Sequence, residues 1–269
     1  MSSKAKFTSS ILTANSLSIG YKDKRETIEI ASQINFEIQP GELVALIGIN
    51  GSGKSTLLKT LSGIIPALTG DILIDNASIS SLQNKDLASK QSLVLTNEIV
   101  SKQLSVFELV ALGRHPYTNW LGHLNQKDLN HVDEAIKQVG LLQNQHKTCD
   151  ALSDGQFQKV LIARALAQNT PLILMDEPTT HLDMYHKAYV LQLLKSIVKR
   201  SQKSILYASH EINLALQLCD KIILIDQGKV TYGRPSDLIQ KGTFNSLFPK
   251  DLIVFDEISQ SFRMKISTD

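Results

Sequence analysis

One stretch of the chain has the residue types and the spacing of a phosphate-binding loop. Residues 48–56 read Gly-Ile-Asn-Gly-Ser-Gly-Lys-Ser-Thr, which satisfies the pattern G-x-x-x-x-G-K-[ST] between a strand-like apolar run and a helix-like run. Glycines let backbone N–H groups close around phosphate oxygens, and the start of a helix adds a favourable dipole. Lys54 is expected to reach the β- and γ-phosphates of a nucleotide, and the Ser55 hydroxyl to bind Mg²⁺. The nucleotide-binding residues predicted here are Gly48, Asn50, Gly51, Ser52, Gly53, Lys54, Ser55 and Thr56.

Two acidic residues, Asp176 and Glu177, follow the apolar run 172–175. The carboxyl ends of strands in an α/β sheet form the edge at which ligands bind. Asp176 is expected to hold Mg²⁺ directly or through water, and Glu177 to polarise a water molecule for attack on the γ-phosphate. The alternative is a strand end with two solvated acids, and the phosphate loop favours catalysis over it.

A third patch, residues 152–156, reads Leu-Ser-Asp-Gly-Gln and begins a predicted helix with Ser153 at its cap. A helix start is an anion site, and Ser153, Gly155 and Gln156 offer hydroxyl, backbone and amide donors. Taken alone, this patch would be an ordinary helix start. Its position 23 residues before Asp176 makes it specific, because a family then becomes recognisable.

These patches, together with Ser209-His210-Glu211, resemble the ATP-binding subunits of ABC transporters over roughly residues 11–242. The resemblance implies that two subunits form a head-to-tail homodimer with ATP sandwiched between the phosphate loop of one and the 152–156 helix of the other. Ser153, Gly155 and Gln156 would then contact the γ-phosphate bound by the partner copy.

The same resemblance assigns roles to three further residues. His210 matches the histidine that touches the γ-phosphate, and the alternative is a satisfied histidine after a strand. Asp183 matches the important position of a loop that crosses the dimer. Tyr21 is similar to the aromatic residue that stacks on adenine, and the alternative is a core tyrosine on a strand face.

Three positions depart from the family pattern. Ile49 stands where proline is usual, which should alter the stiffness of the loop. Asp154 replaces the commoner glycine and brings a negative charge near a partner's γ-phosphate, a variant that occurs among importers. Asn97 falls on the position of a glutamine near the metal and the attacking water, so it is expected to serve beside Mg²⁺ with a side chain one methylene shorter.

The segment 112–117, Leu-Gly-Arg-His-Pro-Tyr, is similar to one in the importer branch that handles iron–siderophore complexes, haem and cobalamin. The resemblance places it in a helical subdomain that docks on membrane permease subunits, which in turn receive cargo from a substrate-binding protein. Tyr117 and Trp120, exposed beside Arg114, would suit such an interface because aromatic residues and arginine serve as anchors. The alternative is a rigid loop packed on its own subdomain.

The surrounding elements predict an α/β protein with a parallel sheet, since apolar runs alternate with helical patterns. Its fold class is expected to be a P-loop NTPase (RecA-like) core with an N-terminal antiparallel β-subdomain over 11–38 and an inserted helical subdomain at about 98–152. Residues 113–123 are predicted to be a loop. Residues 243–269 have a different texture and are predicted to be a C-terminal extension that forms a small hairpin.

Composition narrows the class of protein further. The 269 residues carry a net charge of +2 with 42% hydrophobic residues, which predicts no broad basic face and no nucleic-acid partner. Apolar runs fall far short of the ~18 residues of a membrane span, and the first ten residues lack the apolar region of a secretion signal. Two cysteines suit a reducing compartment. The resemblance implies a peripheral position on the cytoplasmic face of the inner membrane.

Three other functions share this chemistry. The first is the ATPase of an exporter or lipid transporter, which its membrane partners would identify. The second is a soluble ABC-type ATPase in DNA repair or translation, which typically carries a coiled-coil insertion or tandem nucleotide units. The third is a nucleotide-binding regulator without turnover. Asp176, Glu177 and His210 argue against it, whereas Asn97 leaves it open.

Overall fold

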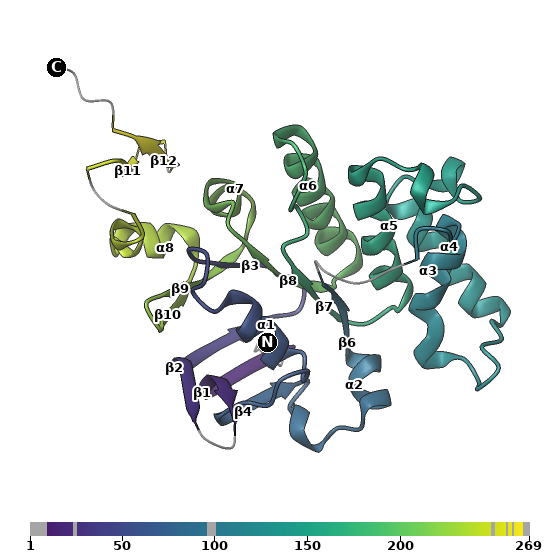
Figure 1. Cartoon of the computed structure of the whole chain (residues 1–269), viewed down its shortest axis with the longest axis horizontal. Coiled ribbons are helices and arrows are strands. Elements are labelled where there is room, and N and C mark those ends of the chain that lie inside the picture. The colour runs from purple at the N-terminus through teal and green to yellow at the C-terminus, as the bar shows by residue number, and fades with distance from the viewer. Residues whose placement is uncertain are drawn as a thin grey trace, which may run out of the picture.

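A mixed six-stranded sheet forms the centre of the molecule. The computed structural model describes residues 10–23, 26–95, 101–248, 251–256, 258–259 and 261–265 (Figure 1). The strand order is β10-β9-β3-β8-β7-β6, in which β10 pairs antiparallel with β9 and the other neighbours are parallel. The strands are β3 (Leu43–Ile47), β6 (Gln91–Val94), β7 (Leu172–Asp176), β8 (Ser204–Ser209), β9 (Lys221–Asp226) and β10 (Lys229–Gly233).

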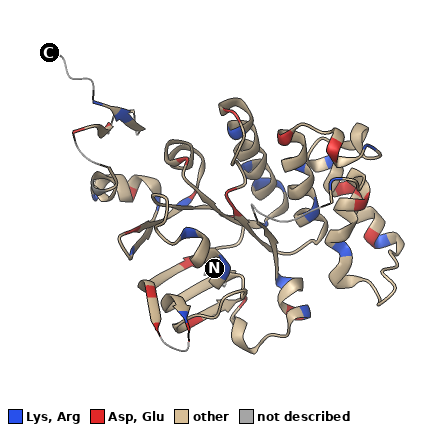
Figure 2. Ribbon diagram, viewed as in Figure 1, with Lys and Arg blue, Asp and Glu red and all other residues tan. Residues whose placement is uncertain are grey.

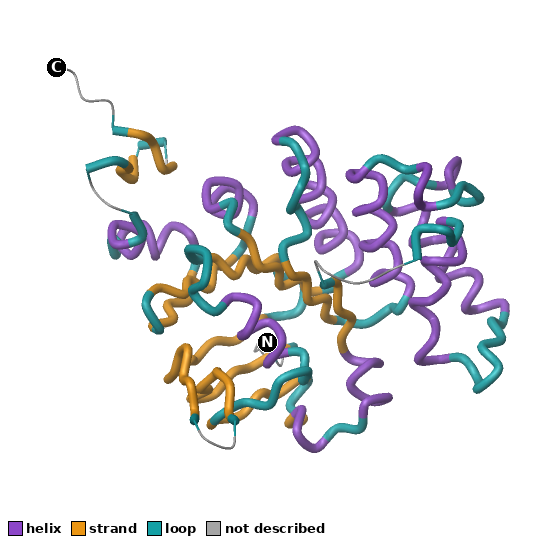
Figure 3. Tube along the Cα trace, in the orientation of Figure 1, coloured by secondary structure: helices purple, strands orange, loops and turns teal. Residues whose placement is uncertain are grey.

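Both faces of this sheet are covered, and alternation along each strand divides the core in two. Leu43, Ala45 and Ile47 of β3 belong to one buried cluster, whereas Val44 and Leu46 belong to the other. The first cluster contains the helices on one side of the sheet, and the second contains α1 (Lys54–Leu61) and the antiparallel strands (Figure 3). Burial on both faces explains why β3 and β7 are continuous apolar runs.

The antiparallel sheet lies below the central one in Figure 1 and has the order β2-β1-β4-β5. Its strands are β1 (Leu12–Lys22), β2 (Thr27–Ile38), β4 (Thr69–Ile74) and β5 (Ala77–Ser78). The alternation of apolar and polar residues in residues 11–38 therefore predicts β1 and β2 correctly. After a 3₁₀ turn, η1 (Ile79–Ser81), α2 (Asn84–Lys90) leads the chain into β6.

Three helices pack together at the other end of the molecule from the C-terminus (Figure 1). They are α3 (Val106–Ala111), α4 (Gln126–Gln138) and α5 (Asp154–Ala167), joined by 3₁₀ helices η2 (Leu112–Tyr117), η3 (Leu142–Asn144) and η4 (Cys149–Ala151). The apolar spacing of three and four predicts α3 and α4. The prediction of a loop over 113–123 is wrong for its first half, because η2 continues directly from α3.

The side chain of Arg114 corrects a second expectation. It is 5% exposed and lies inside the helical subdomain, where its Nε donates to Asp128 Oδ1 at 2.9 Å and its Nη1 to the carbonyl of Ala167 at 2.7 Å. Tyr117 covers the guanidinium, with its ring centroid 4.1 Å from Cζ. Arg114 therefore fastens η2 to α4 and α5, and only Tyr117 (39% exposed) and Trp120 (92% exposed) of the predicted trio face solvent.

The remaining helices follow β7, β8 and β10 in that order. They are α6 (Met184–Ser201), α7 (Ile212–Leu218) and α8 (Pro235–Gln240). Beyond the 3₁₀ turn η5 (Thr243–Ser246), strands β11 (Ile253–Asp256) and β12 (Ser261–Met264) pair antiparallel. Phe244, Phe248, Phe255 and Phe262 form an aromatic cluster that joins this hairpin to the turn before it.

Charges of both signs are interspersed over every part of the ribbon (Figure 2). Within the described part of the chain, none of the helices has the length and apolar character that crossing a bilayer requires.

Candidate nucleotide site

Three of the four sequence patches meet at one edge of the central sheet. The phosphate loop follows β3, Asp176 ends β7 and His210 follows β8. These strands are parallel neighbours in the order β3-β8-β7, so their carboxyl ends lie side by side. The sheet topology thus gathers residues that are more than 150 positions apart in the sequence.

The phosphate loop requires glycine at two positions because atoms of neighbouring strands approach its backbone closely. Gly53 has φ 106°, and a Cβ there would lie 2.4 Å from Ile30 Cγ2. A Cβ on Gly48 would lie 2.5 Å from the Ile225 carbonyl oxygen. The loop therefore lies directly against Ile30 of β2 and the carbonyl at the end of β9. It leads into α1, whose N-cap is Gly53.

Two side chains of the loop fit a phosphate group. Ser52 Oγ is buried and has no hydrogen-bond partner within the described structure. Lys54 is 5% exposed, and its Nζ donates to the carbonyl oxygens of Gly48 (2.9 Å) and Ile49 (3.1 Å) within the loop. Burial lowers the pKa of Lys54, although the carboxylates of Glu177 and Asp176 oppose this effect. An anion in the loop would give the Ser52 hydroxyl a partner and the ammonium a counter-charge.

The donor set for a divalent cation is in place. Ser55 Oγ lies 3.2 Å from Asp176 Oδ1 and donates a hydrogen bond to it. Burial raises the pKa of Asp176, and the nearby Glu177 carboxylate acts in the same direction, while the Ser55 hydrogen bond lowers it. A hydroxyl and a carboxylate are the hard oxygen ligands that Mg²⁺ prefers, so these residues fit the metal.

Glu177 is held in an unusual backbone conformation beside the metal ligands. Its φ is 45°, a region that non-glycine residues rarely occupy and that is common at functional sites. Its N–H donates to the Ala208 carbonyl at 3.1 Å, and Thr180 Oγ1 donates to Glu177 Oε2 at 2.9 Å. The same Oε2 lies 3.6 Å from Nδ1 of His210. The two predicted catalytic residues are therefore neighbours across β7 and β8.

His210 faces a second carboxylate on its other side. Its Nε2 lies 3.2 Å from Glu211 Oε1, and this oxygen also accepts a short hydrogen bond from Lys187 Nζ on α6. His210 is exposed, so a ligand at the sheet edge can reach it. Thr180, Lys187 and Glu211 are functional candidates that sequence reasoning missed. Lys187 and Glu211 are 24 residues apart and carry no local signal.

Tyr21 lies beside the phosphate loop. Its side-chain OH is 3.1 Å from Oγ1 of Thr56 on α1, and 47% of the residue is exposed. The tyrosine is therefore not a core residue, and its exposed ring is available to a flat ligand.

The residues of the fourth patch cap their own helix. Ser153 and Gln156 form a capping box at the start of α5, in which each side chain bonds the backbone N–H of the other. Gly155 is buried against α6, because a Cβ there would lie 2.8 Å from Cδ2 of His186. Asp183 caps α6 by accepting from the His186 N–H at 2.8 Å, and bonds to the His186 backbone and ring hold its pKa below the ordinary value. The first turns of α5 and α6 thus lie together.

A cavity of about 230 Å³ separates this helix start from the catalytic acids. Asp154 and Lys102 line it on one side, and Asp176, Glu177 and His181 on the other. Asp154, which replaces the glycine usual in the family, therefore lines the same cavity as Asp176 and Glu177. Asn97 lies outside the described residues, so its role remains a prediction.

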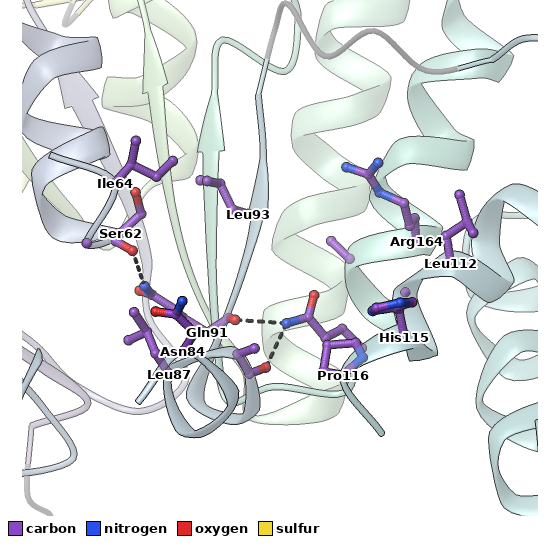
Figure 4. Close-up of a pocket in the computed structure, with 15 residues that line it drawn as sticks. Ser62, Ile64, Asn84, Leu87, Gln91, Leu93, Leu112, His115, Pro116 and Arg164 are labelled. Atoms are coloured by element: carbon purple, nitrogen blue, oxygen red, sulfur yellow. Dashed lines mark hydrogen bonds between the residues drawn. The ribbon is translucent and has the colours of Figure 1, made fainter. Parts of the chain in front are cut away.

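A second, larger cavity of about 480 Å³ opens between the central core and the helical subdomain (Figure 4). Ile64, Leu87 and Leu93 line it from the core, and Leu112 and Pro116 from η2. The remaining lining residues are Ser62, Gly63, Asn84, Ala88, Gln91, Gly113, His115, Arg164, Ala165 and Gln168.

Hydrogen bonds of Gln168 join the two sides of this groove, and a further bond of Gln91 holds the core side together. Gln168, at the end of α5, donates through Nε2 to the carbonyls of Ala88 (2.7 Å) and Gln91 (3.0 Å), and Gln91 Nε2 donates to the Ser62 carbonyl at 2.9 Å (Figure 4). These bonds tie α5 to α2, β6 and the end of α1. Sequence reasoning did not find this groove, because its lining comes from four separate stretches of the chain, within 62–64, 84–93, 112–116 and 164–168.

Comparison with known proteins agrees with this geometry. Residues 31–180 match the family model described as ABC transporter. The petrobactin import ATP-binding protein FpuD of Bacillus anthracis is 38% identical over 224 residues, covering 83% of this chain and 82% of that protein. The iron(3+)-hydroxamate import ATP-binding protein FhuC of Bacillus subtilis is 35% identical over 242 residues, covering 90% and 86%.

Solved structures show the same fold. A chain described as belonging to a metal-chelate type ABC transporter in an inward-facing conformation superposes with a TM-score of 0.77 at 26% identity, covering 95% of this chain and 96% of that one. The ATP-binding cassette MJ0796, in a dimeric post-hydrolysis state bound to ADP and Pi, gives a TM-score of 0.71 at 29% identity, covering 83% and 98%.

The predicted family and fold class are therefore confirmed, including the α/β P-loop core and its β-subdomain. The phosphate loop, the acidic residues that end β7 and the histidine after β8 lie at one edge of the sheet, and the chain belongs to the ABC transporter family, as an ATP-binding and ATP-hydrolysing subunit.

Proposed function

We propose that this chain energises an importer of iron–siderophore complexes, haem or cobalamin by hydrolysing ATP. The observation that carries the hydrolysis is the 3.2 Å contact between Ser55 Oγ and Asp176 Oδ1, which joins the phosphate loop to the acidic strand end. The cargo class is supported by the relatives, whose names record petrobactin and iron(3+)-hydroxamate import.

Each predicted residue takes a role that its position supports. The phosphate loop, with Lys54 and the Ser52 hydroxyl, binds the phosphates, and Tyr21 stacks on adenine. Ser55 and Asp176 would bind Mg²⁺, with Asn97 beside it, and the bound ion would neutralise phosphate charge. Glu177 orients and polarises the attacking water, and His210 contacts the γ-phosphate.

Two copies of the chain are proposed to close on ATP head to tail. The capped start of α5, with Ser153, Gly155 and Gln156, then meets the γ-phosphate held by the other copy, and Asp183 crosses between them. Binding closes the homodimer because donors from both copies meet the same charges, and hydrolysis removes those contacts. A dimeric relative with ADP and Pi supports this arrangement.

We assign permease docking to the groove between the core and the helical subdomain. Leu112 and Ile64 lie on opposite walls of it and are 50% and 53% exposed, so they offer apolar surface to a partner. Leu112→Glu should abolish co-purification with the permease. Leu142→Glu is the matched control, because Leu142 is also 50% exposed in the helical subdomain but lies outside the groove. Equal co-purification of both variants would remove the groove from the proposal.

The proposal divides the chain into a nucleotide-binding domain over 11–242, with the helical subdomain at about 98–152, and an extension over 243–269. It places the protein peripherally on the cytoplasmic face of the inner membrane. Cargo would reach the transporter through a substrate-binding protein that this chain serves only indirectly.

Glu177→Gln tests the hydrolytic assignment. The amide cannot act as a base, so turnover should fall to background while ATP affinity is kept, and sedimentation with Mg·ATP should show dimers. Turnover near that of wild type would exclude Glu177 as the base. Monomers alone, with the permease present, would exclude the composite site.

The cargo class needs a separate measurement. Cells that lack this gene should lose uptake of the radiolabelled iron(III)–siderophore complex that their transporter carries. Wild-type protein should restore uptake, and Lys54→Ala should not, because Lys54 is the cation of the phosphate loop. Unchanged uptake of siderophore, haem and cobalamin in the deletion strain would overturn the cargo assignment.

A further inference from the structure

A chain of charged side chains links the start of α6 to both catalytic residues. Lys187 Nζ pairs with Glu211 Oε1, and this oxygen lies 3.2 Å from Nε2 of His210. The other ring nitrogen of His210 lies 3.6 Å from Glu177 Oε2. One imidazole therefore sits between two carboxylates, and one of the two carboxylates is shared with a lysine.

The position of the Lys187–Glu211 pair beside His210 suggests a role in addition to stability. The Lys187 and Glu211 side chains are 22% and 25% exposed, so water screens part of their attraction. Glu211 Oε1 contacts both Lys187 and His210, so the positive charge of Lys187 weakens the attraction between Glu211 and the His210 ring. Lys187 lowers that attraction and leaves the ring free to turn toward a phosphate.

Lys187 lies close in the sequence to Asp183, the residue proposed to contact the second copy in the dimer. Its backbone N–H donates to the Asp183 carbonyl at 2.9 Å, so Lys187 closes the first turn of α6, four residues after the residue that caps the helix. Any shift of the Asp183 loop moves Lys187 with it, because both belong to one helix start. A shift of this kind changes the distance between Lys187 and Glu211.

We propose that Lys187 and Glu211 are positioning residues that set the orientation of His210 and pass the state of the Asp183 loop to it. The inference rests on the proposed function, since it takes His210 to contact the γ-phosphate. Neither residue touches nucleotide. In the separated chain Glu211 holds His210, and docking of a second copy at Asp183 strengthens the Lys187–Glu211 pair and releases the ring.

Lys187→Met in the full-length protein tests the pair. Without the lysine, Glu211 keeps its whole charge for His210, so kcat should fall about tenfold, as expected for a misplaced catalytic group. KM for ATP should stay within about twofold, because binding does not involve the pair. Lys187→Arg restores the cation and should return kcat to within about twofold of wild type.

The same helix offers a matched control. Lys195 pairs with Asp220 at 2.6 Å, has a 21% exposed side chain, and lies two turns further along α6. Lys195→Met should leave kcat unchanged while altering thermal unfolding by as much as Lys187→Met. A lowered kcat in both variants, a rise in KM that accounts for the loss, or wild-type kcat in Lys187→Met would each overturn the inference.

Glu211→Gln completes the test. The amide keeps the shape of the side chain but not its charge, so Glu211→Gln no longer holds His210 and kcat should stay within about twofold of wild type. Adding Glu211→Gln to Lys187→Met should restore kcat, because no charge is left to hold the ring, and a tenfold loss that persists in the double variant would contradict the pairing. A wild-type protein without Mg·ATPase activity would instead refute the proposed function itself, whatever the variants do.

Discussion

Replacing Arg114 with methionine should destabilise the helical subdomain strongly. The guanidinium is 5% exposed, pairs with Asp128 (3% exposed), and also donates to the carbonyl of Ala167 at the end of α5. Methionine fills a similar volume but leaves a buried carboxylate and a buried carbonyl without their donor. The change therefore isolates the pair without creating a large cavity.

The size of the effect follows from these contacts. Breaking a buried pair by removing one partner costs about 3–5 kcal/mol, since the charge that remains is uncompensated. At about 2–4 °C per kcal/mol for a chain of this size, the midpoint of thermal unfolding should fall by roughly 10 °C. An exposed arginine such as Arg200 provides the control, because Arg200→Met should change the free energy of unfolding by less than about 0.5 kcal/mol.

The effect should also depend on pH, with a defined sign. Burial alone would raise the pKa of Asp128, but hydrogen bonds from the Asn125 backbone and from Arg114, together with the charge of Arg114, hold it below the ordinary value. The pair therefore stabilises the protein above the unfolded pKa of about 3.9, and this contribution is lost as the pH falls through the folded pKa. Calorimetry should show a gap in unfolding free energy between wild type and Arg114→Met that is full at pH 7 and narrows as the pH falls below about 4.

Two results would refute this reasoning. One is a shift no larger than that of Arg200→Met, which would mean that solvent reaches Asp128 and replaces the arginine. The other is a gap that widens in acid, which has the wrong sign for a carboxylate paired in the folded state.

Further predictions concern single positions. Gly113→Ala should lower the melting temperature by several degrees, because the added methyl would lie 2.2 Å from the Arg164 carbonyl oxygen, and circular dichroism would measure it. Tyr21→Ala should raise KM for ATP about tenfold through lost stacking, whereas Tyr21→Phe should not, as steady-state ATPase assays can distinguish. Burial raises the pKa of Cys219 to about 12, against the opposing hydrogen bond from Tyr207, so iodoacetamide should label it at pH 8 only after denaturation, as mass spectrometry would report. Because this pKa is raised, Cys219 should favour the folded state below its unfolded pKa of about 8.5 and cease to do so as the pH rises toward 12.

The sequence was most informative where chemistry depends on neighbours along the chain. The spacing within residues 48–56 and the pair Asp176-Glu177 are local patterns, and each identifies its element without knowledge of the rest of the fold. The helix start at Ser153 was predicted for the same reason, since a capping box lies within four residues.

Contacts between distant segments could not be predicted in this way. Arg114 was expected at an interface, but its partners Asp128 and Ala167 lie 14 and 53 residues further along and converge only in the folded subdomain. The link between Lys187 and Glu211 has the same character. Short elements without strong periodicity, such as η2 and β10, were also missed, because their conformation depends on the neighbouring element, α3 for η2 and β9 for β10, more than on their own propensity.

Two side chains, Gln168 and Arg114, hold the end of α5 in place by hydrogen bonds. Its 14 residues span about 21 Å, from the capping box at Ser153 to Gln168, which ties it to Ala88 and Gln91, and Arg114, which grips its last carbonyls. Because the helix is stiff and its last turn is hydrogen-bonded to the residues that line the groove, we expect a displacement at Ser153 to be transmitted along α5 to the groove. The movement driven by ATP is therefore expected to reach the groove as a tilt of the whole helix. Weakening the hydrogen bonds of Gln168 or Arg114 should uncouple ATP hydrolysis from transport.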